Sequence, residues 1–316
     1  MENDKLPYIS VIITAYNRKE FLLNAIKSAL NQTLDKKYYE IIAIKNFRDK
    51  NIDDFINENR IKHIVMDGTV GEFLDKAISE ANGEIISFLD DDDLFFKNKL
   101  DSVYKEFKKD NDVVYYHNLC VIVNENEKIT NINNMQTSPY SNMSSISIKK
   151  SIVKINKANK INISTVPDIL MYLYALESHK KIIKGKEKLT YYMLHNSISN
   201  IASNNFEEYR KFVITNLDLV LNNYMLFRNI FHSKKAINYI TSQITGTQIY
   251  MNIFGANKIP SKLINYIVNS SGSSGGLKYR IVLFLSYILI KIYPKSRRYI
   301  SNKIWNVHSN RYDEII

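Results

Sequence analysis

The sequence predicts an α/β fold in which a mostly parallel central sheet is flanked by helices, with a helical extension at the C-terminal end. Three observations predict this fold class. Apolar, β-branched segments alternate with helically spaced segments over roughly the first hundred residues. Four consecutive aspartates, Asp90 to Asp93, directly follow one apolar segment. From Phe206 onward the pattern changes to long helical stretches, so we expect a domain of residues 1–205 and a mainly helical region of residues 206–316.

The first domain begins with a regular alternation of strands and helices. Runs rich in β-branched residues predict strands at residues 8–15, 39–44, 62–66 and 84–89. Helical spacing of apolar residues predicts intervening helices at residues 22–30, 52–59 and 70–81. We expect Gly83 at the C-cap of the last of these helices. Strands separated by helices usually run parallel, which favours a sheet covered by helices on both faces.

Later elements of the domain follow at less regular spacing. The sequence predicts a helix around Leu100 to Phe107, a strand at residues 113–123, a helix at 168–177 and a strand at 188–194. In parallel α/β sheets, ligands bind beyond the carboxyl ends of the strands. Residues 14–18 and the aspartate run both follow such ends, so we expect them to face one cleft.

The composition indicates a globular protein in a reducing compartment. Hydrophobic residues make up 45% of the chain and aromatic residues 12%, which is ordinary for a packed domain. The single cysteine, Cys120, excludes an internal disulfide and a cysteine-cluster metal site. The first residues lack the apolar segment of a secretory signal, so we expect the mature protein to begin near Met1 and to be cytoplasmic.

Positive charge is concentrated in the last third of the chain. Residues 1–205 contain 28 Lys and Arg against 27 Asp and Glu, whereas residues 206–316 contain 15 against 5, a net charge of +10. Such a basic region indicates an anionic partner, either lipid headgroups or nucleic acid. Because no nucleic-acid-reading module is recognisable, we expect no specific nucleic-acid partner and favour peripheral contact with the cytoplasmic face of the membrane.

An apolar segment, residues 281–290, lies within this basic region. A helix of this length extends about 15 Å, against about 30 Å for the hydrocarbon core of a bilayer, so it is too short to span. One interpretation is a membrane-interface helix over residues 277–293 whose basic flanks contact anionic headgroups. The alternative is a helix buried against the rest of the protein or against a second subunit, which leaves the oligomeric state open.

The aspartate run is the most informative feature for chemistry. Asp90 to Asp93 directly follow the strand-like residues 84–89. Carboxylates this close repel one another unless a cation or solvent intervenes. Their oxygens are suitable ligands for Mg²⁺ or Mn²⁺. After such a strand, the run therefore suggests a divalent metal site; a solvated turn is the alternative.

Three segments, in order, resemble the family 2 glycosyltransferases with the GT-A fold, the nucleotide-diphospho-sugar transferase fold. They are residues 10–18 (SVIITAYNR), 25–33 (AIKSALNQT) and 81–93 (ANGEIISFLDDDD). The similarity extends over residues 8–205. It implies an enzyme that uses a nucleotide sugar, a UDP- or GDP-sugar, together with Mn²⁺ or Mg²⁺.

The resemblance also implies a pocket for the donor. Thr14, Tyr16 and Asn17 would line it around the base and ribose, because an aromatic ring offers a stacking face and small polar side chains leave the backbone accessible. Asn46 belongs to the same expected pocket, although the second strand of relatives usually ends in acidic residues and here ends in Lys45 and Asn46. The alternative is a loop that only turns the chain.

The family's Asp-x-Asp motif maps onto Asp90 and Asp92 as metal ligands. Asp90 and Asp91 would also border the donor. The register of the motif stays open, because Asp91 and Asp93 form a second spaced pair. His195, in a segment similar to the family's Tyr-x-x-His-x-x-Ser-x-Ser, would be a further metal or diphosphate ligand; the alternative is a hydrogen-bonded core histidine.

Transfer with inversion needs a general base that takes the proton from the acceptor hydroxyl. In the resembled family this acid is usually the Asp of a Glu-Asp pair that opens a helix. Residues 165–174 (TVPDILMYLY) fit, with Pro167 in place of the Glu, so Asp168 is the expected base. Its alternative role is a helix N-cap.

The sequence thus predicts a metal-dependent inverting glycosyltransferase that acts on a hydroxyl of a glycan or lipid-linked acceptor. A non-catalytic protein that retains the fold, and serves as a sugar-nucleotide-binding or membrane scaffold, is the alternative. The substitutions at Lys45, Asn46 and Pro167 favour that alternative.

Overall fold

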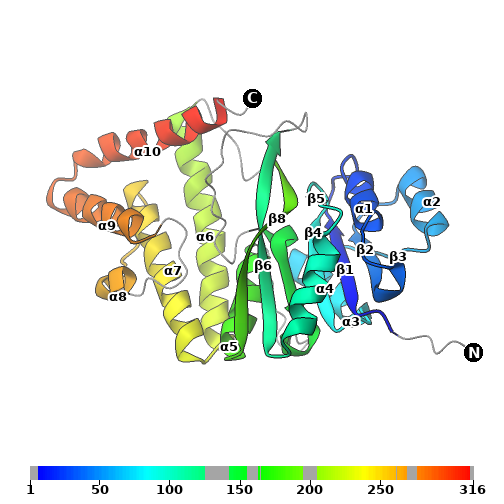
Figure 1. Ribbon diagram of the computed structural model, residues 1–316. Helices are drawn as coiled ribbons and strands as arrows, with labels where there is room; N and C mark the ends of the chain where they lie inside the picture. Colours follow the sequence, from blue (N-terminus) through cyan, green and yellow to red (C-terminus); the bar gives the residue numbers. More distant parts are fainter. Residues whose placement is uncertain are drawn as a thin grey trace, which may run out of the picture. The chain divides into compact units, whose positions relative to one another are not determined.

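The computed structural model describes residues 6–124, 142–154, 163, 165–194, 205–260, 262–268 and 276–313. The chain divides into two compact units, Met1–Met193 and Leu194–Ile316. The first unit is built of strands and helices, and the second is helical (Figure 1). The predicted α/β fold class with a helical C-terminal part is confirmed.

One sheet organises the first unit. Its described strands are β1 (Ile9–Ala15), β2 (Tyr39–Lys45), β3 (Lys62–Val65), β4 (Ile85–Asp90), β5 (Leu94–Phe95), β6 (Val113–Asn124), β7 (Ile146–Lys149) and β8 (Lys181–Leu194). They lie in the order β3-β2-β1-β4-β7-β6-β8-β5. Strands β3, β2, β1 and β4 are parallel, whereas β7 pairs antiparallel with β4 and β6, and β5 pairs antiparallel with β8. The parallel strands end at one edge, where the candidate site lies.

Helices cover this sheet. They are α1 (Leu22–Leu30), α2 (Lys50–Glu58), α3 (Val70–Glu80), α4 (Lys99–Lys109) and α5 (Pro167–Glu177), with short 3₁₀ turns η1 (Lys36–Tyr38), η2 (Met143–Ser145) and η3 (Lys150–Ile152). Alternate residues of a strand point to opposite faces. Ile9, Val11 and Ile13 of β1 share a core cluster with apolar residues of α1, α2 and α4. Helix α3 contacts β1 and β2, and α5 contacts β6 and β7.

Local sequence explains where two of these helices begin. Asp49 caps α2 by accepting a hydrogen bond from the Ile52 backbone N–H at 3.3 Å. Thr69 and Glu72 form a reciprocal capping box at the start of α3, which satisfies two N–H groups that would otherwise lack partners.

Gly83 has a different role from the predicted one. Helix α3 already ends with Ala81 at its C-cap. Gly83 instead lies against β1, where an added Cβ would be 2.5 Å from the backbone nitrogen of Ser10. The Gly83 N–H donates to Ser10 Oγ at 2.8 Å. A side chain at position 83 would therefore collide with β1, the strand that leads into residues 14–18.

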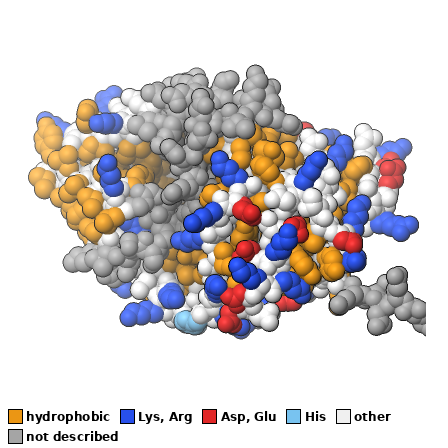
Figure 2. Space-filling view, viewed as in Figure 1, with side chains coloured by type: hydrophobic (Ala, Val, Ile, Leu, Met, Phe, Trp, Pro, Cys, Tyr) orange, Lys and Arg blue, Asp and Glu red, His pale blue; other side chains and the backbone are white. Residues whose placement is uncertain are grey.

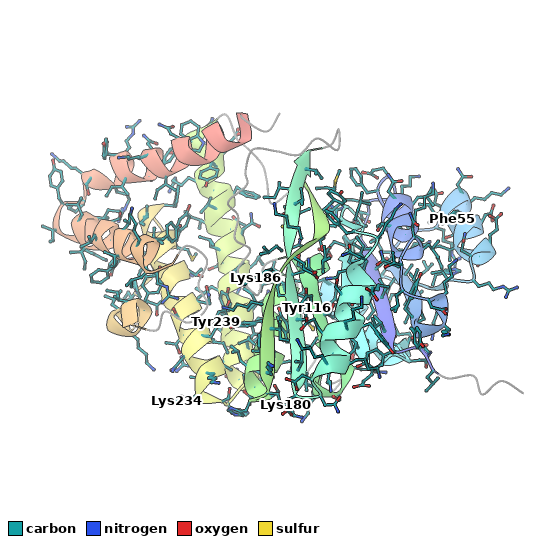
Figure 3. The ribbon with its side chains drawn as sticks, viewed as in Figure 1. Phe55, Tyr116, Lys180, Lys186, Lys234 and Tyr239 are labelled. Carbon is teal, nitrogen blue, oxygen red and sulfur yellow. The ribbon has the colours of Figure 1, made fainter. Side chains whose placement is uncertain are left out.

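Strand β8 begins seven residues before the predicted start, at Lys181 instead of Lys188. Its first half, KIIKGKEK, is charged and lacks the apolar alternation that signals a strand. Gly185 in this half permits close packing, because an added Cβ would lie 2.5 Å from the hydroxyl of Tyr116, which is labelled in Figure 3.

The second unit contains α6 (Phe206–Ile230), α7 (Lys234–Ile253), α8 (Leu263–Val268), α9 (Gly276–Ile292) and α10 (Ser296–Asp313). Its core includes Tyr209 of α6, Ile249 and Ile253 of α7, and Leu283 and Ile290 of α9. Among the described residues, none of the helices combines the length and the apolar character needed to cross a bilayer.

Helix α9 is apolar on two faces. Leu283, Tyr287 and Ile290 are buried in the core of the second unit. The other face carries exposed apolar side chains. Together with Tyr293, which directly follows the helix, we call them the exposed stripe; its residues are Val282, Leu285, Leu289, Ile292 and Tyr293. Hydrophobic side chains gather in Figure 2 where α9 lies in Figure 1.

Candidate active site

The ends of β1 and β4 bring Thr14 and Asp90 side by side. These residues are direct partners in the parallel register. The Thr14 hydroxyl donates to Asp90 Oδ1 at 3.4 Å. The Asp90 backbone N–H donates to Ser144 Oγ of η2 at 2.9 Å. Residues 14–18 and the aspartate run thus meet at one edge of the sheet, as the sequence predicts.

Arg18 links the loop of residues 14–18 to the aspartates. Its guanidinium donates to Asp92 Oδ2 at 2.6 Å and also to Asp91. Burial raises the pKa of Asp91 to about 7, although Arg18 acts to lower it. Burial acts to lower the pKa of Arg18, but the carboxylates of Asp92 and Asp91 outweigh it and raise that pKa. The arginine therefore neutralises part of a carboxylate cluster that is costly to ionise.

Sequence reasoning did not single out Arg18 as a site residue. The available signal was its place in the loop after the first strand, opposite the expected aspartate run.

Asp93 faces a different partner. Its Oδ1 accepts a hydrogen bond from the Met193 backbone N–H of β8 at 3.1 Å, and the residue is buried. Burial, with Asp92 and then Asp90 as further causes, raises the pKa of Asp93 well above its usual range. Asp93 thus ties the acidic turn to β8.

Asp168 lies in the first turn of α5, after Pro167 at the start of the helix. Its Oδ1 accepts from the Ile169 backbone N–H at 2.9 Å. Burial raises the pKa of Asp168 to about 6, while backbone hydrogen bonds from Ile169 and Asn142 act in the opposite direction. A carboxyl with such a pKa is mostly ionised at neutral pH yet more basic than an exposed aspartate.

The charge of Asp168 reaches the aspartate run. Burial raises the pKa of Asp90 to about 8, and the carboxylates of Asp92, Asp91 and Asp168 raise it further, against the lowering effect of Arg18. Carboxyls from β4, the following turn and α5 thus share one electrostatic environment. These elements are far apart in the sequence.

The expected donor residues on the two loops also meet. The Asn17 backbone N–H donates to Asn46 Oδ1 at 2.8 Å, and Asn46 Nδ2 donates to Asn17 Oδ1 at 2.7 Å. Asn17 has a φ of +57°, a conformation that asparagine tolerates better than most residues. Tyr16 is 56% exposed, so its ring is available to a ligand. Lys45 is buried and forms an ion pair with Asp53 at 2.7 Å, away from solvent.

A series of buried hydrogen bonds connects Lys99 to the backbone of the acidic turn. Lys99 donates to Asn118, whose Nδ2 donates to Thr190 Oγ1 at 3.0 Å. The Thr190 hydroxyl donates to the Ser144 carbonyl at 3.0 Å, and Ser144 in turn accepts from the Asp90 backbone N–H. Burial lowers the pKa of Lys99 to about 7. This series of hydrogen bonds fixes the backbone at Asp90.

Among the residues that the structure describes, no three His, Cys, Asp or Glu side chains are arranged to hold a metal ion by themselves. Mg²⁺ usually takes only one or two protein carboxylates and completes its shell with water and substrate phosphates. Asp91 Oδ2 is a buried oxygen without a hydrogen-bonding partner in the described part of the chain. Such an oxygen fits a hard cation, although it belongs to Asp91 and not to the expected ligands Asp90 and Asp92. His195 lies outside the described residues.

The chain has relatives among known proteins. Residues 10–166, about half of the chain, match the family model described as "Glycosyl transferase family 2". An uncharacterized glycosyltransferase of Rickettsia bellii is 33% identical over 126 residues, which cover 38% of this chain and 18% of the relative. This chain therefore spans less than a fifth of that relative's length.

Two solved structures share the fold over nearly the whole chain. Residues 1–349 of S. aureus TarS in complex with UDP-GlcNAc align with a TM-score of 0.53 and 14% identity, covering 97% of this chain and 92% of that one. Mannosyltransferase PcManGT from Pyrobaculum calidifontis, in complex with GDP-Man and Mn²⁺, aligns with a TM-score of 0.54 and 10% identity, covering 97% and 86%.

Proposed function

Because residues 10–166 place this chain in glycosyl transferase family 2, we propose that it is a metal-dependent inverting transferase. It moves a sugar from a nucleotide sugar to a hydroxyl of a glycan or lipid-linked acceptor. Its GT-A fold and its membership of a transferase family agree with the sequence prediction. The metal dependence, the inversion at the anomeric carbon and the nature of the acceptor are what we propose beyond family membership.

The observation that carries the proposal is the shared environment of Asp168 and the aspartate run. Asp168 comes from α5, whereas Asp90 ends β4, yet the charge of one raises the pKa of the other. An inverting transfer needs positive charge that neutralises the leaving diphosphate and a base on the acceptor side. The aspartate run would hold a cation for the first task, and Asp168 would be the base for the second.

Asp90 and Asp92 are the residues proposed to hold a divalent cation. Asp90 ends β4, and Asp92 is a partly exposed carboxylate in the turn that follows. The chemistry that a bound cation supplies is neutralisation of charge on the departing diphosphate. His195 stays a proposed additional ligand. Arg18, already beside Asp92, adds a guanidinium suited to phosphate oxygens.

Asp168 is the proposed base. Two backbone N–H groups, from Ile169 and Asn142, orient its carboxylate. Its pKa of about 6 leaves it ionised at pH 7.5 and able to accept a proton from an acceptor hydroxyl. A helix N-cap is a weaker explanation, because the N-cap of α5 is Val166 and because Asn142, whose N–H also bonds Asp168, lies outside this helix.

The donor is proposed to lie over the loop of β1. Thr14, Tyr16, Asn17 and Asn46 are on adjacent strand ends, and the paired amides of Asn17 and Asn46 hold the two loops together. Asp90 and Asp91 border the same edge. The two fold relatives are in complex with UDP-GlcNAc and with GDP-Man, which supports a sugar nucleotide with either base.

We also propose that the protein contacts the cytoplasmic face of a membrane through α9. The exposed stripe has apolar side chains at i, i+3, i+7 and i+10, counted from Val282, as on an interfacial helix. Lys278, Lys291 and Lys295 flank it and are exposed. Lysines beside an apolar helical face suit anionic headgroups.

The reaction is tested with a panel of UDP- and GDP-sugars. We expect one donor to release nucleoside diphosphate in the presence of Mn²⁺ or Mg²⁺ and not in EDTA. A chain that binds a donor but releases no diphosphate with any cation or acceptor preparation would instead support the non-catalytic alternative.

A further inference from the structure

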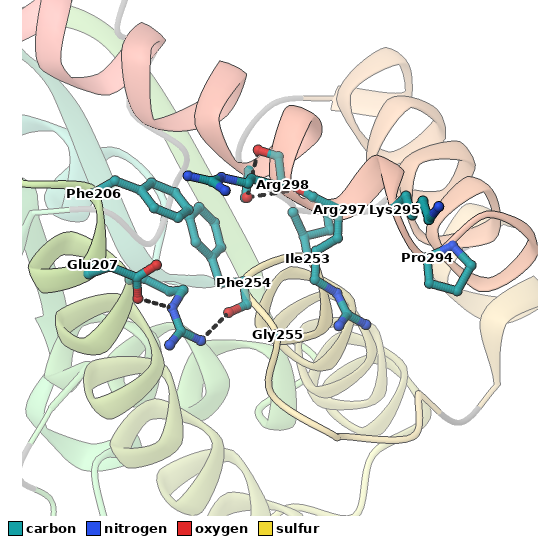
Figure 4. Close-up of a pocket in the computed structure, with 11 residues that line it drawn as sticks. Phe206, Glu207, Ile253, Phe254, Gly255, Pro294, Lys295, Arg297 and Arg298 are labelled. Carbon is teal, nitrogen blue, oxygen red and sulfur yellow. Dashed lines mark hydrogen bonds and ion pairs between the residues drawn. The ribbon is translucent and has the colours of Figure 1, made fainter.

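A cavity of about 520 Å³ lies wholly within the second unit (Figure 4). It is formed by the start of α6, the end of α7 and the turn that joins α9 to α10. We call it the basic pocket, after its charged residues Arg210, Lys295, Arg297, Arg298 and Glu207. Its volume is in the range of ligand pockets. It belongs to a different unit from the aspartate run.

Four cations and one carboxylate line the basic pocket. The carboxylate, Glu207, is bound to Arg210 Nε at 2.9 Å. Arg210 Nη1 also donates to the Phe254 carbonyl at 3.3 Å, which fixes its guanidinium at the wall. The remaining positive charges have no acidic neighbour among the residues that line the pocket. The pocket therefore has an excess of positive charge.

Arg297 has an unsatisfied donor. Its Nε is buried and has no hydrogen-bonding partner in the described part of the chain. A buried donor of this kind normally finds an acceptor. An anion in the pocket would provide one.

Arg210 and Arg297 approach the same point. Gly255 has a φ of +94°, and an added Cβ there would lie 3.3 Å from Arg210 Nη1 and 4.0 Å from Arg297 Cδ. The missing side chain thus leaves room between two arginines. A single guanidinium can bind two phosphate oxygens with two parallel N–H groups.

The basic pocket adjoins the exposed stripe along the chain. Ile292 and Tyr293, at the end of the stripe, are followed directly by Pro294 and Lys295 of the pocket wall. A phosphate bound there would lie beside apolar side chains, as a lipid headgroup does at the edge of its acyl chains.

We propose that the basic pocket binds the headgroup phosphate of an anionic phospholipid. The proposal rests on the membrane contact suggested for α9, and it is independent of sugar transfer. Arg297 and Arg210 would hold the phosphate, while Lys295 and Arg298 supply charge at the rim.

Sedimentation of the full chain with vesicles tests this proposal. The probes are vesicles of phosphatidylcholine alone and vesicles with one quarter phosphatidylglycerol, at 150 mM salt. We expect binding only to the second, and at least a tenfold loss in R297Q/R298Q. The matched variant K234Q/K235Q removes the same charge from exposed lysines outside the pocket and should change binding less than threefold.

Equal losses of binding in both variants would mean unspecific charge attraction and would contradict the proposed binding of a phosphate in the basic pocket. Unchanged vesicle binding of R297Q/R298Q would contradict it as well. Free glycerol phosphate and a phosphorylated soluble glycan serve as competitors. If the glycan displaces the protein from vesicles far better than glycerol phosphate does, the source is a glycan and the lipid proposal is wrong.

Folding and catalysis are followed separately. K295Q/R298Q changes only exposed side chains and should also weaken vesicle binding without shifting the thermal midpoint. Nucleoside diphosphate release by R297Q/R298Q in solution should equal that of the wild type. Its loss together with a lowered thermal midpoint would mean that the variant is misfolded, and K295Q/R298Q then decides the proposal.

Discussion

Arg18 holds Asp92 in an ion pair of 2.6 Å and reaches Asp91 with its other amino group. The loop after β1 and the turn after β4 are thereby joined across the edge of the sheet. The guanidinium occupies a carboxylate that is proposed to hold a cation. Arg18 and a bound cation would therefore both neutralise the negative charge of Asp92.

Replacing Arg18 should make the protein depend more strongly on a bound cation for its stability. In R18Q we expect the metal-free protein to melt at a lower temperature, because burying an unpaired carboxylate is costly. The increase in the melting temperature on adding Mn²⁺ should be larger than in the wild type, because the cation no longer competes with Arg18. Differential scanning fluorimetry with a Mn²⁺ titration measures both.

The matched control for R18Q is K19Q, which removes the same charge from an exposed neighbour that pairs with Asp49 at 3.4 Å. It should leave the Mn²⁺-dependent increase unchanged. A smaller Mn²⁺ effect in R18Q than in the wild type would argue that Arg18 helps to bind the cation instead.

Stability should fall with rising pH in the metal-free protein. The folded-state pKa of Asp168 is about 6, above the usual value of about 3.9 in an unfolded chain. Between these values the folded state binds more protons than the unfolded state, so each increase in pH favours unfolding. The loss is complete above the folded pKa and amounts to roughly 2–3 kcal/mol.

Urea unfolding in EDTA between pH 4.5 and 7.5 measures this slope. Asp90, with a pKa of about 8, adds to it and extends it to higher pH. D168N should remove the part contributed by position 168. A wild-type protein that becomes more stable over this range would contradict the burial of these carboxyls.

Gly83 should be intolerant of a side chain. In G83A the new Cβ would lie 2.5 Å from the Ser10 nitrogen, so β1 or the loop must shift. We expect a loss of about 1–3 kcal/mol in the free energy of unfolding. E84A, at an exposed neighbouring position, is the control and should have a much smaller effect in the same urea experiment.

The exposed stripe should determine membrane binding. L285E/L289E places two charges in the stripe, and we expect it to lose binding to vesicles that contain phosphatidylglycerol, because charged side chains avoid apolar interfaces. M225E/L226E makes the same change at exposed apolar residues of α6 and should bind as the wild type does. Equal binding of all three proteins would exclude the stripe as a contact.

Much of the first unit could be predicted from the sequence because its strands are short apolar runs separated by helical spacing. The positions of β1, β2, β3 and β4 follow from this pattern. The start of β8 could not be predicted, because charged residues such as Lys184 and Lys186 interrupt the apolar pattern of the strand. Gly83 was misassigned because its role is close contact with β1, which depends on tertiary packing.

The site was predictable in part for a similar reason. Asp90 and Thr14 follow apolar strands, and parallel strands end together. The ion pairs of Arg18 and the hydrogen bond from Met193 to Asp93 depend on how turns approach one another in space. No periodicity in the sequence reports such contacts.

The most direct measurement for the whole account is single-turnover transfer from the identified nucleotide sugar, with wild type, D168N and the surface control E58Q compared in Mn²⁺. We expect D168N to bind the donor with the wild-type Kd but to transfer about 10²–10⁴ times more slowly, and the wild-type rate to rise with pH to a plateau above about 6, near the pKa of Asp168. E58Q should match the wild type. Wild-type transfer rates in D168N, or full activity in EDTA, would contradict the proposed mechanism.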